Sequence, residues 1–257
     1  MDDRQHEPAA ERHLAVPPRV ARLGEYFSLP EALPEALPAA GPDWLRFEEL
    51  LDATTLTGLV TATRRAIAVS SGAEVDDVPE RVAASSLQLA MAARLVSPLI
   101  GSVLTTRNAP LLTPGSLRWS SAGHSVRFAA TGLRWRRAED AAGAAGTIRD
   151  TFLEGAMAAI VESLHSAVSL SPTVMWGNTI SAAHGAVTVA GMTDPTLIPA
   201  GRQLVRAMAD TGPLTGTAAV GEGTFTRRSC CLFYLAPGGG LCGDCVLQAS
   251  DRSHRSH

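Results

Sequence analysis

Four cysteines, all near the C-terminus, constrain the fold of this chain more than any other feature of its sequence. Cys230 and Cys231 are adjacent, ten residues separate them from Cys242, and two more separate Cys242 from Cys245. The first 229 residues contain no cysteine. The opening residues lack the apolar stretch of a secretory signal peptide, so we expect a cytoplasmic location, where thiols stay reduced. In such a compartment this cluster indicates a metal site before it indicates disulfides.

The composition of the chain narrows the class of protein further. Hydrophobic residues make up 46% of the 257 residues and charged residues 18%. This is enough to bury a full core, which excludes a disordered chain and a disulfide-stapled mini-protein. The net charge is −3 and all 22 basic residues are arginine, with no long basic stripe. We therefore expect no nucleic-acid partner. No run of 18 uncharged apolar residues is present, so we expect no transmembrane segment.

Residue patterns predict an α+β fold that is mainly α-helical. Between 116 and 137 the hydrophobic period changes to two, with Gly-containing turns, which predicts two or three short antiparallel strands. The small residues 141–146 are typical of a linker. We expect a single domain of two lobes with one small antiparallel sheet. Apolar residues recur at helical spacing in five segments, 43–69, 76–98, 148–168, 171–189 and 194–208.

The same patterns divide the chain into four parts. Residues 1–40 form a Pro-rich N-terminal arm with little core of its own. Residues 41–223 form a mainly helical scaffold that binds the substrate, and its small sheet lies near 116–137. Residues 224–248, here called the cysteine segment, form the C-terminal loop that binds the metal group. Residues 249–257 form a tail.

The cysteine spacing by itself leaves two kinds of metal site open. Four thiolates hold either one tetrahedral zinc ion or a [2Fe–2S] cluster. Gly243 lets the knuckle between Cys242 and Cys245 turn its backbone N–H groups toward the sulfurs. Adjacent cysteines on an extended strand point to opposite sides, which favours two separate irons, although a local turn aims both at one zinc. A zinc-stabilised binding module with purely structural cysteines is therefore the competing function.

At these residues the sequence resembles a known family. RRSCCLFYLAPGGGLCGDC is similar to the C-terminal signature of the FhuF-type ferric-siderophore (ferric iron) reductases, whose pattern is Cys-Cys, ten residues, Cys, two residues, Cys. All four positions match without insertion. Upstream, MWGN at 175–178 resembles the family's Trp-Gly-Asn motif, and RVAASSLQLAMAARLVSPLIG is also similar. The resemblance extends from about Asp43 onward.

The resemblance implies an oxidoreductase that passes one electron through a [2Fe–2S] cluster to Fe(III) held in a siderophore. Fe(II) has a much weaker claim than Fe(III) on the anionic oxygen donors of a siderophore, so reduction releases the iron. The substrate favoured is a ferric siderophore of the hydroxamate type. The chain shows neither a GxGxxG motif in front of a helix nor a Walker loop, so electrons are expected to come from a separate donor protein such as a ferredoxin or flavin reductase. Iron is released in the cytoplasm, or by a protein held peripherally at the inner face of the cell membrane. The implied cluster ligands, with no catalytic residue beyond them, are Cys230, Cys231, Cys242 and Cys245.

Four other residues are candidates for binding the substrate or tuning the cluster. Arg227 and Arg228 are either solvated charges at a strand end or charges that tune the potential of an anionic cluster and attract an anionic partner. Trp176 either fills the core or contributes to the site, and Asn178 either bonds a backbone group or contributes to the site. The sequence does not decide between these alternatives.

Overall fold

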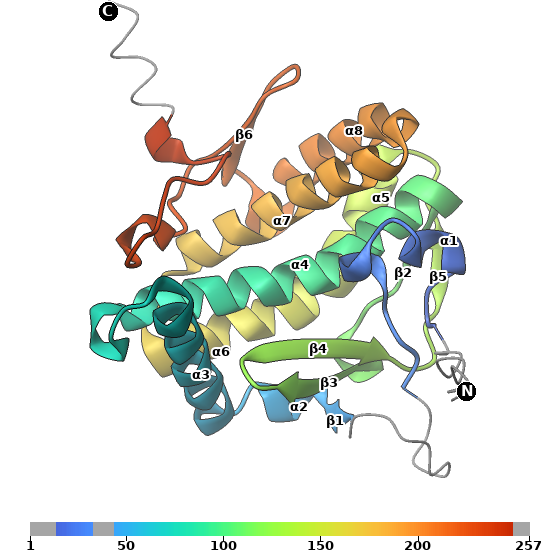
Figure 1. Cartoon of the computed structure of the whole chain (residues 1–257). Helices are drawn as coiled ribbons and strands as arrows, with labels where there is room; N and C mark the ends of the chain where they lie inside the picture. The colour runs from blue at the N-terminus through green and yellow to red at the C-terminus, as the bar shows by residue number, and fades with distance from the viewer. Residues whose placement is uncertain (1–13, 33–43, 249–257) are drawn as a thin grey trace, which may run out of the picture.

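The computed structural model describes residues 14–32 and 44–248, and Figure 1 shows how its elements are arranged. The tail and part of the N-terminal arm lie outside the described residues. The helices are α1 Pro18–Ala21, α2 Phe47–Leu50, α3 Ala53–Ser71, α4 Glu80–Thr106, α5 Ala141–Ile148, α6 Ala158–Val168, α7 Pro172–Thr193 and α8 Ile198–Ala209, with a π-helix, Arg149–Met157, between α5 and α6. The strands are β1 Leu45–Arg46, β2 Asn108–Pro110, β3 Leu117–Ala122, β4 Ser125–Ala130, β5 Trp135–Arg137, β6 Ala218–Val220 and β7 Phe225–Arg227. The predicted class, a mainly α-helical α+β fold, is confirmed.

Helix α4 is the centre of the fold. It crosses the middle of the molecule, with α7 and α8 on one side of it and the β3–β4 hairpin on the other (Figure 1). Among the described residues it is the one helix long and apolar enough to cross a membrane, and 67% of its apolar stretch is buried inside the fold. Because a helix that is hydrophobic on most sides needs partners all round, α4 packs against α3, α6 and α7 together.

The β3–β4 hairpin is the antiparallel pair that the sequence predicts. It runs in register from Leu117 opposite Ala130 to Ala122 opposite Ser125, and Gly123 in its turn has a φ of +63°. The third predicted strand, β5, does form, but it pairs with β2 in a separate sheet. A further hairpin, β6–β7, has its second strand inside the cysteine segment, directly before the first cysteine pair.

The expected linker at 141–146 is wrong, because these residues form most of α5. The Asp140 carboxylate accepts a hydrogen bond of 2.7 Å from the backbone N–H of Gly143 and so caps the helix. Alanine has the highest intrinsic helix propensity, and four of the eight residues of α5 are alanine. Tertiary packing buries Ala144 and Ala145 completely. A run of small residues therefore acts here as a close-packed helix.

The described part of the N-terminal arm packs onto α4. Val20, Phe27 and Leu29 are buried in the main core. Gly101 of α4 makes this approach possible, because a Cβ at that position would lie 2.6 Å from the Phe27 ring. The arm thus adds side chains to the core of the helical domain.

Candidate metal centre

The cysteine segment lies across the N-terminal halves of α4 and α7 (Figure 1). Two contacts anchor it there. The Ser85 hydroxyl of α4 donates a 2.7 Å hydrogen bond to the carbonyl oxygen of Cys231. Gly177 of α7 faces Ser229, and a Cβ at Gly177 would collide with the Ser229 hydroxyl. The segment is therefore attached to the helical core immediately before and at the first cysteine pair.

The thiols of the two halves of the motif approach each other. Cys231 Sγ and Cys242 Sγ are 3.8 Å apart. Two sulfurs bound to one tetrahedral metal through bonds of about 2.3 Å are themselves separated by about 3.8 Å. Cys231 is 7% exposed and Cys245 is 2% exposed, whereas Cys230 and Cys242 are half-buried. All four thiols are free, and one from each half already stands at the separation of metal co-ligands.

The chain between the two cysteine pairs folds back on itself. Leu232 has a φ of +68°, unusual for a residue with a side chain, and its backbone N–H donates to Cys230 Sγ at 3.3 Å. Gly239 packs so closely on the carbonyl oxygen of Phe233 that any Cβ would collide with it. The left-handed turn at Leu232 thus directs a backbone donor at a sulfur, and Gly239 permits the reversal.

Arg227 joins the cysteines to the helical core. Its side chain is 1% exposed, and its Nη2 donates to Cys242 Sγ at 2.6 Å. Its Nη1 donates to the Asn178 side-chain oxygen at 2.9 Å, and its Nε lies 3.1 Å from Asp244 Oδ2. The backbone N–H of Arg227 also donates to the Asp244 carbonyl oxygen at 3.1 Å. One buried guanidinium therefore contacts a candidate ligand, a carboxylate and a helix side chain at once.

The structure gives different environments to Arg227 and Arg228, which the sequence did not distinguish. Neighbouring residues on a strand point to opposite sides, so Arg227 faces inward and Arg228 faces solvent. A solvated strand-end charge describes Arg228, and that alternative is wrong for Arg227.

The Trp-Gly-Asn motif on α7 also divides. Asn178 is fully buried and its side-chain amide donates to the carbonyl and hydroxyl oxygens of Ser85, at 3.2 and 3.0 Å. Its side-chain oxygen accepts from Arg227, so Asn178 connects Ser85 of α4 with Arg227 of the cysteine segment. Trp176 is partly buried and packs against the hydrophobic core. Asn178 therefore joins the hydrogen-bond network around the cysteines, whereas Trp176 takes the packing position.

Three residues of this network are absent from the sequence-based candidates. Asp244 pairs with Arg227 and accepts a 2.5 Å hydrogen bond from the Ser181 hydroxyl. Its place between the last two cysteines was the signal that could have drawn attention to it. Ser85 and Ser181 carry no such signal, because each lies on a helix far from the cysteines in sequence.

Electrostatics around the thiols favour a bound cationic group. Burial raises the pKa of Cys230 and raises that of Cys242 to about 12. Burial opposes ionisation of Cys231 too, but the Phe233 backbone N–H and the Arg227 guanidinium bring its pKa below the ordinary value. The protein's own charges therefore favour one thiolate of the close pair. A metal held by these cysteines would supply the positive charge that favours the thiolate form of the others.

The donor set fits a two-iron cluster. Its four free thiols lie in two halves, with hydrogen-bond donors from Leu232 and Arg227 directed at two sulfurs. Within residues 14–32 and 44–248, no three His, Cys, Asp or Glu side chains are grouped to hold one metal ion. A mononuclear zinc site is therefore not preformed in the described structure.

Comparison with known families agrees with this chemistry. Residues 227–247 match the FhuF 2Fe-2S C-terminal domain, so the matched stretch begins at Arg227 and includes all four cysteines. Over these residues the expected resemblance to the FhuF-type family with its C-terminal 2Fe–2S motif is confirmed, and the cofactor that this domain indicates is a [2Fe–2S] cluster. The resemblance expected upstream, from about Asp43, lies outside the matched stretch and stays a prediction. No curated protein matches the chain.

Proposed function

With a FhuF-type 2Fe–2S domain at residues 227–247 as the premise, we propose that this protein reduces Fe(III) in ferric siderophores by one electron. A separate donor protein supplies the electron, Fe(III) becomes Fe(II), and the chelator leaves with its covalent bonds intact. The weaker hold of oxygen donors on Fe(II) then frees the metal in the cytoplasm. The observation that carries this proposal is the family match over a segment whose four thiols are free and grouped in two halves.

The proposed ligands are the four cysteines, and the bound cluster supplies a one-electron carrier whose negative charge grows on reduction. The surrounding residues are placed to stabilise that negative charge. Arg227 and the Leu232 backbone N–H donate to sulfurs, which stabilises negative charge on them. Asn178 and Asp244 hold the guanidinium in place from two sides. Arg227 is therefore proposed to favour the reduced protein.

The outer side of the cysteine segment is open to reaction partners. Phe233, Tyr234 and Leu241, all between the two cysteine pairs, are exposed. A ferric siderophore is too bulky to be fully enclosed by the protein, so we expect it to bind at a site that is open to the surface. A hydroxamate siderophore is the favoured substrate, because three hydroxamate groups neutralise Fe(III), and among the described residues 224–248 Arg228 is the one exposed arginine.

The experiment that tests this function uses the purified, cluster-loaded protein. After anaerobic reduction it is mixed with ferric desferrioxamine, a trishydroxamate complex, while visible absorbance reports the cluster and a ferrous chelator traps the product. We expect one Fe(II) formed for each cluster reoxidised. The gallium(III) complex of the same chelator is the matched control, since it cannot accept the electron. A cluster that is reoxidised by small mediators but by no ferric chelate contradicts the proposal.

The zinc-stabilised binding module makes a different prediction for the same sample. It predicts a colourless protein with stoichiometric zinc, whereas the proposed function predicts a red-brown protein with two irons and bound sulfide. Metal analysis of the protein as isolated, without reconstitution, separates the two.

A further inference from the structure

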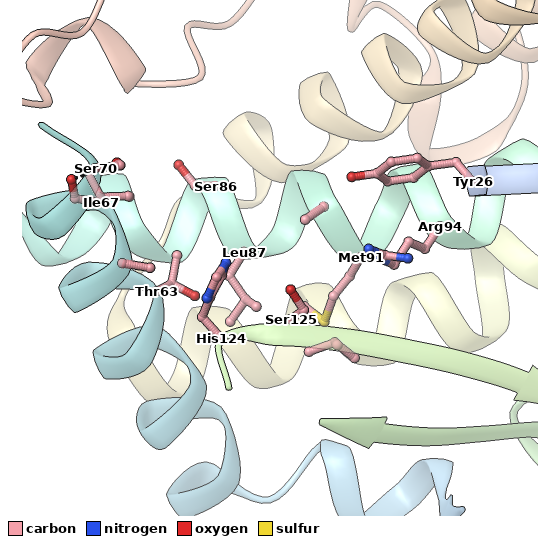
Figure 2. A pocket seen from close by; sticks show the side chains of 13 residues that line it. Tyr26, Thr63, Ile67, Ser70, Ser86, Leu87, Met91, Arg94, His124 and Ser125 are labelled. Atoms are coloured by element: carbon pink, nitrogen blue, oxygen red, sulfur yellow. Dashed lines mark hydrogen bonds between the residues drawn. The ribbon is translucent and has the colours of Figure 1, made fainter. Parts of the chain in front are cut away.

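A cavity of about 390 Å³ lies beside the N-terminal half of α4, apart from the cysteines (Figure 2). Its floor is the face of α4 that carries Ser86, Ala90 and Arg94, spaced four residues apart. Helix α3 forms one wall, the turn of the β3–β4 hairpin forms another, and Tyr26 closes one end. Volumes of about 300–1,000 Å³ are typical of sites for small molecules.

The cavity combines an apolar surface with hydrogen-bond donors. Leu87 and Met91 supply apolar contact, and hydroxyl donors come from Ser86 of α4 and Ser125 of β4. The hydroxyl of Thr63 also lines the cavity, but it donates to the carbonyl oxygen of Leu59 at 2.9 Å. The Ser86 and Ser125 hydroxyls suit a neutral molecule that is rich in oxygen and has apolar linkers. A single guanidinium and one histidine, His124, add limited positive charge.

The guanidinium of Arg94 is available to a ligand. It lies 4.7 Å from the centre of the Tyr26 ring and only reaches Glu25, a largely exposed carboxylate, at 4.0 Å. An ion pair this long and this exposed contributes little, so a ligand oxygen competes with it easily. Stacking on Tyr26 meanwhile keeps the guanidinium over the cavity.

Two adjacent residues of α4 connect this cavity with the cysteine segment. Ser86 lines the cavity, and Ser85, the next residue along the chain, donates its hydroxyl hydrogen to the carbonyl oxygen of Cys231. Figure 2 shows Ser86 projecting at the end of the cavity nearer to the C-terminal segment. One peptide unit and one hydrogen bond thus connect the cavity with the backbone of a candidate ligand.

We propose that this cavity binds the ferric siderophore, with the Arg94 guanidinium and the hydroxyls of Ser86 and Ser125 donating to the oxygens of the chelate. The inference rests on the proposed function, because it assigns that reaction a substrate site. The bound complex accepts one electron from the reduced protein, so Fe(III) becomes Fe(II) and no covalent bond is made or broken. A chelate with several negative charges fits less well, because Arg94 is the one arginine among the lining residues that the structure describes.

The test measures binding separately from reduction. Oxidised, cluster-loaded protein is titrated in a calorimeter with gallium(III) desferrioxamine, which has the shape of the substrate and cannot be reduced. Ala90 is an exposed floor residue, so Ala90→Trp fills the cavity without enlarging a side chain in the core. Ala142→Trp, at an exposed position of α5 that lines no part of the cavity, is the matched control. We expect Ala90→Trp to weaken binding at least tenfold, Arg94→Gln to weaken it several-fold, and the control to bind normally.

Each outcome decides the site or the function. Binding that is equally tight in Ala90→Trp and in the unaltered protein overturns the site, as does an unaltered protein that binds no gallium complex. If the unaltered protein reduces ferric desferrioxamine and Ala90→Trp does so with the same KM, the function stands and the site fails. If the gallium complex binds in the cavity but no ferric chelate is reduced, the site stands and the proposed function fails. Iron content and the visible spectrum of Ala90→Trp show that its metal centre is intact.

Discussion

Replacing Arg227 by glutamine is expected to lower the midpoint potential of the cluster far more than the same change at Arg228. Both substitutions remove one positive charge from adjacent positions of the chain. Arg227 is 1% exposed and touches Cys242 Sγ, whereas Arg228 points into solvent. The pair is therefore a matched test of whether burial beside the thiols gives the charge its effect.

The magnitude follows from the contact that Arg227 makes. Its Nη2 is 2.6 Å from Cys242 Sγ. If Cys242 holds a metal through a bond of about 2.3 Å, an electron added to that metal would lie roughly 5 Å from the guanidinium. At an effective dielectric constant of about 20, a unit charge at that distance is worth about 3 kcal/mol. With roughly 59 mV for each 1.4 kcal/mol, the loss of Arg227 lowers the potential by on the order of 100 mV. A solvated charge is worth about 0–1 kcal/mol, so Arg228→Gln changes it by less than about 40 mV.

The assay is a redox titration followed by visible circular dichroism, at low and at high salt. Iron content is measured first, because Arg227→Gln leaves Asp244 and Asn178 without their partner. Asp244→Asn is the second variant, and it removes a negative charge from the same network, so its potential is expected to rise. Opposite signs for these two variants distinguish an electrostatic effect from a general loosening of the segment. High salt should reduce the small Arg228 effect and leave the Arg227 effect largely unchanged.

Equal shifts for Arg227→Gln and Arg228→Gln would refute this reasoning, because burial would then not matter. A fully loaded Arg227→Gln protein with an unaltered potential would refute it as well. Were that variant to lose its iron, a fall in potential for Asp244→Asn would still contradict the predicted electrostatics.

Further outcomes are expected at the cysteines and on α7. Serine at any of the four cysteine positions should abolish normal cluster assembly, measured as iron content and visible absorbance, while far-ultraviolet circular dichroism keeps its helical signal. Gly177→Ala should destabilise the fold by about 1–3 kcal/mol in thermal unfolding and reduce cluster loading, because its Cβ collides with Ser229. Gly185→Ala, on the same helix with open space around it, should be neutral or stabilising by up to about 1 kcal/mol. Burial lowers the pKa of His184, which stacks on Phe225 at 4.2 Å. The unfolded chain therefore binds the proton more readily, so stability is lost as pH falls below about 6.5. His184→Gln should flatten that loss in unfolding measured between pH 7 and 5, and an unchanged slope would show that another group titrates.

Much of the fold follows from local patterns. Helical spacing predicts the positions of α3, α4, α7 and α8, and alternation with Gly123 predicts the β3–β4 hairpin, because periodicity records which face of an element is buried. The linker expected at 141–146 shows where this fails. Small residues give no hydrophobic stripe, so periodicity misses this helix, although the cap at Asp140 and the alanine content favour it and packing against α8 stabilises it.

The candidate ligands also follow from sequence, since they are four thiols within one short segment. The match of that segment to the FhuF 2Fe-2S domain, and not the spacing alone, indicates the cluster. The surroundings of these ligands do not follow from sequence. Arg227 and Arg228 cannot be distinguished from the sequence. Tertiary packing directs the side chain of Arg227 onto Cys242 and that of Arg228 into solvent. Ser85 reaches the carbonyl of Cys231 across 146 positions of the chain, and Asn178 reaches Arg227 across 49. Hydrogen bonds of this kind act over about 3 Å in space, whatever the separation of their partners along the chain. The sequence therefore determines the candidate ligands, while the fold determines the charges and contacts around them.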